Sequence, residues 1–404
     1  MEKKLQTLIG CGDILIECDC DEQVVSSMFD EVRDEIQGAT VAVGHGELPF
    51  SDRGYTTFVD LFVCAPKASP ARNVKIIKEA GFDVMTLCSN HAFDQGPDAL
   101  EDTLRLCDEN DLARTGAGMN LEEASIPAIV ERDGIKYGVL GYNCTGPAGS
   151  WATDRKPGCN YVHSIDTMVH ELPTIGGACP VYSFPVPEQL ERMKNQIAEL
   201  REKVDVLVVS LHKGIGFIPG AIGQHEPVIA HAAIDAGADV IFAHHGHMLK
   251  GIEVYNGKVI FHDLGNLQAL ADLPDGRPFF RYGPLKAQRV RGNLTEEQKL
   301  ARQREFDRRQ GAPYLWGPNG TACDIPPMDQ MYHSMLAKVY IEDGKVIKVN
   351  YVPLRFHDEG APYVLKRSDP EAQQLFEYVK NITEGVWFDT QFEWDGDEVH
   401  IITE

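Results

Sequence analysis

An alternation of apolar strand-like runs with amphipathic helix-like stretches, up to about residue 270 of this 404-residue chain, is the strongest constraint on its fold. Strands interleaved with helices favour an α/β fold, in which helices cover a largely parallel sheet. The expected strands are Thr7–Ile16, Thr40–Val43, Val84–Leu87, Tyr137–Tyr142, Val204–Leu211, Val240–Ala243 and Val259–His262. The expected helical stretches are Asp21–Gln37, Ala71–Glu79, Asp98–Asn110, Pro187–Glu202 and Val228–Ala236.

Residues 269–330 break this rhythm, because they are rich in Arg, Gln, Gly and Pro, with one polar helix expected over Thr295–Gln310. We interpret them as an insertion that packs over the core or against another subunit. In the second case the chain would form a homo-oligomer. Residues 331–404 return to strand pattern, with an Asp343-Gly344 hairpin turn, and we expect 1–404 to form a single domain. The expected strands there are Leu336–Ile341, Lys345–Pro353 and His400–Thr403.

The charge balance excludes some partners. The net charge is −23, from 38 basic and 61 acidic residues, and it repels nucleic acid and anionic membrane surfaces. We find neither a signal peptide nor the roughly 20 consecutive apolar residues that span a bilayer. The ten cysteines are scattered and typical of reduced core thiols, so we expect a cytoplasmic protein.

Polar residues of metal-binding type follow the ends of several expected strands. In an α/β sheet the carboxyl ends of the strands form the binding crevice, so segments far apart in sequence can meet there. Only Asp13 lies inside a strand candidate. The residues are Asp13, Glu47, Asn90, His91, His212, His244, His245 and His247.

This residue set suits a divalent ion. Imidazole with carboxylate favours Zn, Mn or Fe, and an Asn carbonyl adds a neutral oxygen ligand. Taken one by one, the carboxylates could be caps, His212 a hydrogen-bonded strand-end residue, and Asn90 with His91 a turn. Three histidines within four residues, from His244 to His247, are rare without a metal.

In the order of these motifs the sequence resembles the CapA family of poly-γ-glutamate capsule synthesis proteins, within the calcineurin-like metallophosphoesterase superfamily. The family's G-D is matched by Gly12-Asp13, and the end of its N-L-E by Gly46-Glu47. The further matches are Ser89 to Gly96 for N-N-H-A-x-D-x-G, Gly116 to Asn120 for G-A-G-x-N, His212 to Gly214 for H-W-G, Asp235 to His247 for D-x-G-A-D-x-x-x-x-H-x-P-H, and Asp263 to Asn266 for S-L-G-N.

The resemblance implies a four-layer α-β-β-α sandwich and a role for each matched residue. Glu47 would be the metal bridge, and His91 a general acid with Asp94 behind it. His244 would orient the site or contact substrate rather than bind metal. The implied metal ligands are Asp13, Glu47, Asn90, His212, His245 and His247.

Some positions depart from the family and superfamily patterns. The wider superfamily has a His two residues after the first Asp, where this chain has Leu15. The sequence therefore allows a site with either one or two metal ions. His45 could supply the missing ligand. Lys213 replaces a Trp of the family pattern, and Gly246 replaces a Pro. Separately, Arg53 and Arg155 could clamp an anionic substrate or form surface salt bridges.

We therefore expect a metal-dependent hydrolase that cleaves a phosphoester or amide bond of a small or peptide-like anionic substrate with metal-activated water. Three alternatives remain open. The chain could be a component of poly-γ-glutamate capsule biosynthesis, a metal-dependent epimerase or lyase that uses His91 to move a proton, or a non-enzymatic metal-binding scaffold.

Overall fold

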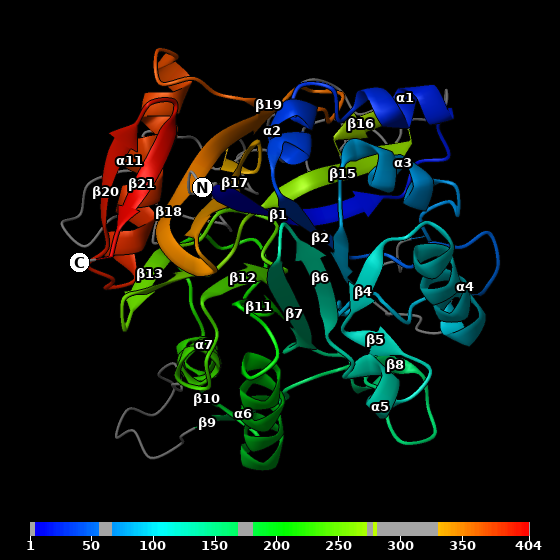
Figure 1. Ribbon diagram of the computed structural model, residues 1–404. Helices are drawn as coiled ribbons and strands as arrows, with labels where there is room; N and C mark the ends of the chain where they lie inside the picture. Colours follow the sequence, from blue (N-terminus) through cyan, green and yellow to red (C-terminus); the bar gives the residue numbers. More distant parts are fainter. Residues whose placement is uncertain (1–4, 56–66, 169–180, 273–277, 281–329, 404) are drawn as a thin grey trace, which may run out of the picture.

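The computed structural model describes residues 5–55, 67–168, 181–272, 278–280 and 330–403. Two β-sheets pack face to face, and helices cover their outer faces (Figure 1). This is the four-layer α/β sandwich expected from the resemblance. Among the described residues, no helix is long and apolar enough to cross a membrane.

Within the described residues the first sheet has eleven strands. Towards one edge β1, β2, β3 and β4 run parallel, with β4 outermost, and on the other side of β1 the antiparallel β17 continues the sheet. The strands are β1 (Gln6–Ile16), β2 (Val41–Gly46), β3 (Val84–Thr86), β4 (Ala113–Thr115), β15 (Asn266–Asp272), β16 (Pro278–Phe280), β17 (His333–Glu342), β18 (Lys345–Phe356), β19 (Pro362–Val364), β20 (Gln391–Asp395) and β21 (Glu398–Ile402).

The second sheet has six strands in the order β13-β14-β12-β11-β7-β6. Its four inner strands, β14, β12, β11 and β7, are parallel, and antiparallel β13 and β6 form its edges. The strands are β6 (Ala128–Arg132), β7 (Ile135–Asn143), β11 (Val206–His212), β12 (Val240–His244), β13 (Ile252–Tyr255) and β14 (Lys258–Phe261).

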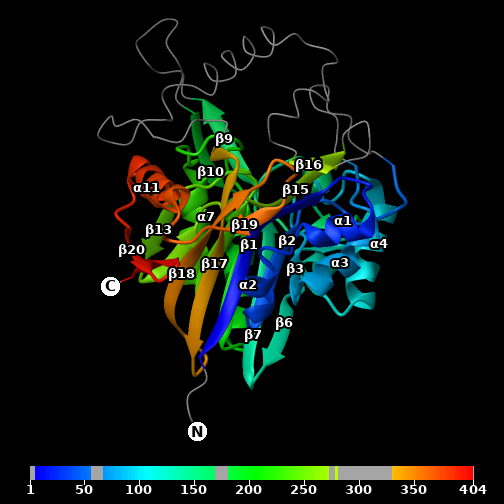
Figure 2. The same ribbon diagram turned by 90° about the horizontal axis from the view of Figure 1, so that it is seen from above.

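Helices α1 (Glu22–Ser27), α2 (Arg33–Gly38), α3 (Asn73–Ala80) and α4 (Gly96–Glu109) cover the first sheet, and α6 (Pro187–Arg201) and α7 (His225–Asp235) cover the second. Helix α11 (Pro370–Gly385) packs beside β13 and β18 at one edge of the sandwich (Figures 1 and 2). The smaller elements are β5 (Ala117–Gly118), α5 (Leu121–Ala124), β8 (Gly158–Cys159), β9 (Ser164–Met168), β10 (Val181–Pro185) and the 3-10 turn Ala148–Ser150.

A hydrophobic core between the sheets joins the two central layers. Val43 and Val84 of the first sheet are buried in the same cluster as Val208 and Phe242 of the second. Gly10 permits this closeness, because a Cβ there would lie 2.3 Å from the Phe242 ring. Both sets of strand ends are therefore held in fixed positions relative to each other.

The expected Asp21–Gln37 helix is instead two short helices, α1 and α2. Arg33 Nη2 donates to the carbonyl of Ser26 at 3.0 Å, and the amides of Phe29 and Asp30 form tighter three-residue turns. These contacts replace the bonds of a continuous helix. The other expected helices and strands up to residue 270 appear within a few residues of their predicted bounds.

Most of the expected insertion, and the whole helix expected over Thr295–Gln310, lie outside the described residues. After it, β17, β18 and β21 extend the first sheet from β1. Asp343 and Gly344 both have positive φ, 51° and 74°, as a two-residue hairpin turn between β17 and β18 requires.

Candidate metal centre

Strands of both sheets deliver polar side chains to one buried point. From the first sheet come Asp13 on β1, His45 on β2, Glu47 just after β2, and Asn266 at the start of β15. From the second sheet come His212 at the end of β11 and the histidines that end and follow β12. Asn90, in the segment after β3, completes the group with its Oδ1 2.6 Å from His212 Nε2, so the structure brings together all six residues expected as ligands.

Asp13 lies where β1 changes its neighbour. Up to Gly10 the strand pairs with β17, and from Asp13 onward it pairs with β15. Gly12 makes this possible, because a Cβ there would lie 2.3 Å from the carbonyl oxygen of Gly265. The irregular pairing turns the Asp13 carboxylate into the space between the sheets.

The turn after β12 is strained. His245 and His247 have positive φ, 97° and 55°, which costs energy for residues other than glycine. Asp263 holds the turn by accepting from the amides of Gly246 at 2.5 Å and Gly265 at 2.8 Å. A Cβ on Gly246 would lie 2.5 Å from that carboxylate, so glycine fits here.

One group of ligand atoms surrounds His247. Its Nδ1 lies 3.3 Å from Asp13 Oδ2 and 3.0 Å from Asn266 Oδ1, and its Nε2 lies 3.4 Å from Glu47 Oε1. Asp13, Glu47 and His247 are all buried, with ligand atoms close enough to share one ion. Nothing in the sequence analysis singled out Asn266 as a site residue, although it stands in the matched S-L-G-N motif.

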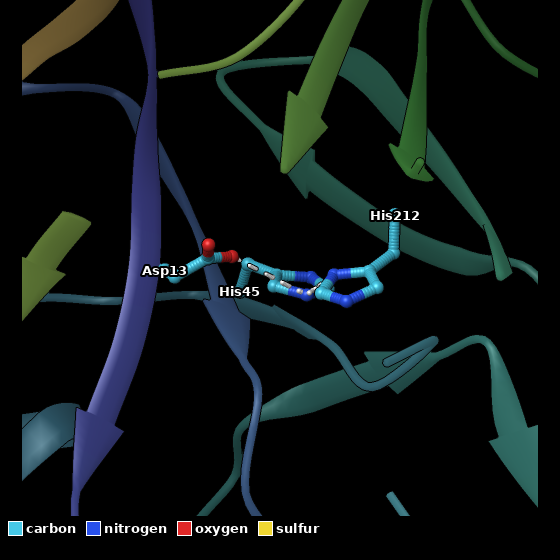
Figure 3. Close-up of side chains that lie close together, drawn as sticks. All are labelled: Asp13, His45 and His212. Atoms are coloured by element: carbon cyan, nitrogen blue, oxygen red, sulfur yellow. Dashed lines mark hydrogen bonds and ion pairs between the residues drawn. The ribbon is translucent and has the colours of Figure 1, made fainter. Parts of the chain in front are cut away.

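A second group surrounds His212. Its Nε2 lies 2.6 Å from Asn90 Oδ1 and 3.2 Å from His245 Nδ1. Its Nδ1 lies 3.0 Å from His45 Nε2, on the side that faces Asp13 (Figure 3). Asp13, His45 and His212 form a second buried set with the spacing of metal ligands.

Burial dominates the electrostatics of these groups. It raises the pKa of Asp13 to about 8 and holds the pKa of Glu47 well above its usual range. It lowers the pKa of His45 and His245 to about 3, with neighbouring histidines adding to the shift. The imidazoles are therefore neutral at pH 7, in the form that binds metal.

Several buried atoms lack hydrogen-bond partners within the described part of the chain. Those that belong to this cluster are Asp13 Oδ1, both carboxylate oxygens of Glu47, and His244 Nδ1. Burying such oxygens without a partner is costly, and a cation would offset that cost. With neutral imidazoles beside them, this donor set fits a divalent ion such as Zn, Mn or Fe.

His91 lies at the open side of the cluster. Its Nδ1 is 2.6 Å from Asp94 Oδ2, and its Nε2 is 3.8 Å from Glu47 Oε1. Its side chain is 27% exposed, against 6% for His247. His91 can therefore meet a molecule that enters from solvent, with its ring orientation set by Asp94.

The three residues expected to bind substrate have other partners. Arg53 makes a bidentate ion pair with Asp102, at 2.8 and 2.6 Å, and Arg155 is 91% exposed beside Asp154. These are the salt bridges that the sequence left as the alternative. The ring of His244, expected to orient the site or contact substrate, is buried, stacked on His45 at 4.1 Å, and its Nδ1 lies 3.6 Å from Asp13 Oδ1.

Lys213 has a structural environment that the sequence did not reveal. Its side chain is fully buried, and its Nζ donates to Glu226 at 2.7 Å and contacts His262 Nδ1 at 2.9 Å. Glu226 also accepts from the Gly223 amide at 2.6 Å. This ion pair anchors both ends of the loop that follows His212.

A cavity of about 540 Å³ lies along the same loop. Gly214 lines it two residues after His212, together with Cys144, His163, Ser183 and His225. His225 Nδ1 is hydrogen-bonded to Ser183 Oγ at 2.9 Å. The cavity has a mainly apolar lining with some polar side chains, and it sits beside the segment that carries a candidate ligand.

Two packed sheets bring one buried set of carboxylates and imidazoles together at their strand ends, as the sequence resemblance implied. Residues 7–269 match the model of the family described as bacterial capsule synthesis protein PGA_cap. The chain is a member of this CapA family.

Curated relatives agree with the family. The chain is 30% identical over 193 residues to the capsule biosynthesis protein CapA of Bacillus anthracis, and 32% over 195 residues to the PGA biosynthesis protein CapA of Bacillus subtilis. Each match covers 48% of this chain but only 41% and 44% of those proteins. The chain thus matches less than half the length of these relatives.

Solved structures with a similar arrangement include the calcineurin-like phosphoesterase YfkN of Bacillus subtilis, at 15% identity and a TM-score of 0.41, covering 95% of this chain and 99% of that one. Another is the purple acid phosphatase PPD1 of yellow lupin, at 9% identity and a TM-score of 0.38, covering 90% and 54%.

Proposed function

We propose that this protein is a metal-dependent hydrolase that cleaves a phosphoester or amide bond. The observation that carries the proposal is the juxtaposition of His91 with the buried Glu47 carboxylate, whose oxygens accept no hydrogen bond from the described residues. When bound, a divalent ion supplies water activation and stabilises negative charge on the leaving oxygen or nitrogen. Asp13, Glu47, Asn90, His212, His245 and His247 are the residues we expect to hold it.

His91 has the geometry of a general acid. Because Asp94 accepts from Nδ1, it fixes the orientation of the ring and leaves Nε2 to donate a proton to the leaving group. The cavity along residues 214–225 gives the remainder of the substrate a space next to this segment, with a mainly apolar lining that also includes polar side chains. An anionic, peptide-like or phosphorylated molecule suits a site that gains positive charge from its metal.

A second candidate is a part in making poly-γ-glutamate. Two relatives carry the names capsule biosynthesis protein and PGA biosynthesis protein, which favours a γ-glutamyl amide as the bond acted on. The two candidates are compatible, since a hydrolase could trim or release such a polymer. They differ in substrate and can be tested side by side.

The first test is elemental analysis of the purified protein beside a His245→Ala/His247→Ala variant. We expect one or two equivalents of a transition metal in the native protein and loss of metal in the variant. Unchanged metal content in the variant would refute the site. Absence of metal from the native protein under metal-replete conditions would refute the metal-dependent function.

The second test screens aryl phosphomonoesters, aryl phosphodiesters and poly-γ-glutamate for hydrolysis. We expect His91→Ala to lower kcat by about 10²–10⁴-fold with unchanged metal content. His357→Ala is the matched control, because His357 also pairs with a carboxylate, Glu31 at 2.8 Å, and carries no expected role. Equal turnover in native protein and His91→Ala would refute the general-acid role.

A further inference from the structure

The loop between β11 and α7 carries an aromatic side chain to which the proposed function assigns no role. Phe217 follows the candidate ligand His212 on this loop and is 40% exposed. Its ring lies against the ring of His247, with 5.3 Å between the centroids and 33° between the planes. Because His247 is buried, the Phe217 ring covers a second candidate ligand on the side of this loop.

The backbone holds Phe217 in a strained conformation. Its φ is 62°, in the left-handed region that bulky residues rarely adopt. The Phe217 amide donates to the carbonyl of Gly246 at 2.9 Å, which ties the loop to the turn after β12. Gly214 fits at the start of the loop, where a Cβ would lie 2.5 Å from Glu226 Oε2. Strained residues of this kind cluster at binding sites, where the surrounding structure holds them in place.

The same loop lines the cavity of about 540 Å³ with aliphatic side chains, Ile215 and Ile222. Among the described residues that line this cavity, none is lysine or arginine, and Asp166 is the one carboxylate. Burial lowers the pKa of His225, so its imidazole brings no positive charge to the lining at pH 7. The loop thus presents an aromatic ring beside the metal centre and a mainly apolar wall in the cavity.

This lining favours an uncharged group over a polyanionic chain. Each residue of a γ-linked glutamate polymer carries a carboxylate, and burying such groups near Asp166 without a cationic partner is costly. An aryl group loses no hydrogen bond on burial, stacks on an aromatic ring and packs against aliphatic side chains. The part of the substrate that lies away from the metal is therefore recognised by apolar contact.

We propose that Phe217 is a specificity-determining residue, whose ring packs against an aryl group of the substrate while the phosphoryl group of the same molecule lies at the metal centre. The aryl group extends along Ile215 toward the cavity. The proposal rests on the metal-dependent function above and deepens it, because it names an aryl phosphoester as the substrate class in preference to poly-γ-glutamate.

The first test is ligand binding, measured by calorimetry on the full chain loaded with Mn²⁺. The probes are phenylphosphonate and methylphosphonate, whose carbon–phosphorus bond resists hydrolysis. We expect phenylphosphonate to bind about tenfold more tightly, as one aromatic contact provides. Equal or tighter binding of methylphosphonate or of tri-γ-glutamate, or failure of both phosphonates to bind, would overturn the proposal.

Variants separate a contact with the ligand from a mere cover over His247. Phe217→Gly removes the ring, and glycine adopts the positive φ without strain. We expect this variant to bind phenylphosphonate about tenfold more weakly and to leave the affinity for methylphosphonate nearly unchanged. Phe217→Tyr keeps an aromatic face and should keep the native preference. Equal weakening of both phosphonates in Phe217→Gly would show a cover only and would refute a contact with the ligand.

Trp387→Gly is the matched control, because Trp387 is also an exposed aromatic residue with positive φ, 68°, and carries no expected role. It should bind both phosphonates as the native protein does. Turnover of phenyl phosphate separates this proposal from the proposed function. Absence of turnover with the phenylphosphonate preference intact would overturn the proposed function alone. Turnover with the same KM in native protein and Phe217→Gly would overturn the role of Phe217 alone.

Discussion

Replacing Asp13 by asparagine is expected to stabilise the metal-free protein while abolishing metal binding. The Asp13 carboxylate is fully buried, and its Oδ1 has no hydrogen-bond partner among the described residues. Asparagine is close in shape and carries no charge. Its oxygen can keep the bond from the His245 amide, and its NH₂ can donate toward His244 Nδ1, 3.6 Å from the present Oδ1.

The magnitude follows from the pKa of Asp13, which burial raises from 3.8 to about 8. Between these values the folded state holds a proton that the unfolded state has released, so the group's effect becomes more destabilising as pH rises. At about 1.36 kcal/mol per pKa unit, the cost is about 4 kcal/mol at pH 7 and about 2 kcal/mol at pH 5. Asp13→Asn should recover up to these amounts.

The assay is urea denaturation of metal-stripped protein in a chelator at pH 5 and pH 7. The matched control is Asp102→Asn, because hydrogen bonds from Arg53 hold the pKa of Asp102 below its usual range. That carboxylate stabilises the fold above its unfolded pKa, so the control should lower stability. A loss of stability in Asp13→Asn at pH 7, or a gain that does not grow from pH 5 to pH 7, would refute the reasoning.

Two further predictions concern charge. Metal binding at pH 7 should release on the order of one proton each from Asp13 and Glu47, because burial raises the pKa of both carboxyl groups. The apparent metal affinity should therefore rise with pH up to about 8. Calorimetry in buffers of different ionisation enthalpy measures the proton release, and metal binding without it would contradict the prediction. Lys213→Met should lower the free energy of unfolding by roughly 3–5 kcal/mol, because it leaves the Glu226 carboxylate buried without its cation. Adding Glu226→Gln should restore part of that loss in urea denaturation, and no recovery would contradict the pairing.

Local chemistry made much of the fold predictable from sequence. The apolar run Thr7–Ile16 and the helical spacing of Pro187–Glu202 are both local signals, and β1 and α6 follow those bounds closely. Turn chemistry is equally local, and Asp343-Gly344 was predicted from it. The same signal at Asp133-Gly134 and Asn256-Gly257, both with paired positive φ, was missed, and with it the hairpins of β6 and β13.

The sequence by itself determined the candidate ligand types and their place after strand ends, because parallel strands in an α/β fold end at the same edge. Only the tertiary structure decided how those side chains face one another. The change of neighbour along β1 aims Asp13, Asp102 engages Arg53, and His244 is buried behind His45. The position of His45 depends on contacts with Thr86 and His212, 41 and 167 residues away, and contacts at such separations leave no periodic pattern in the sequence.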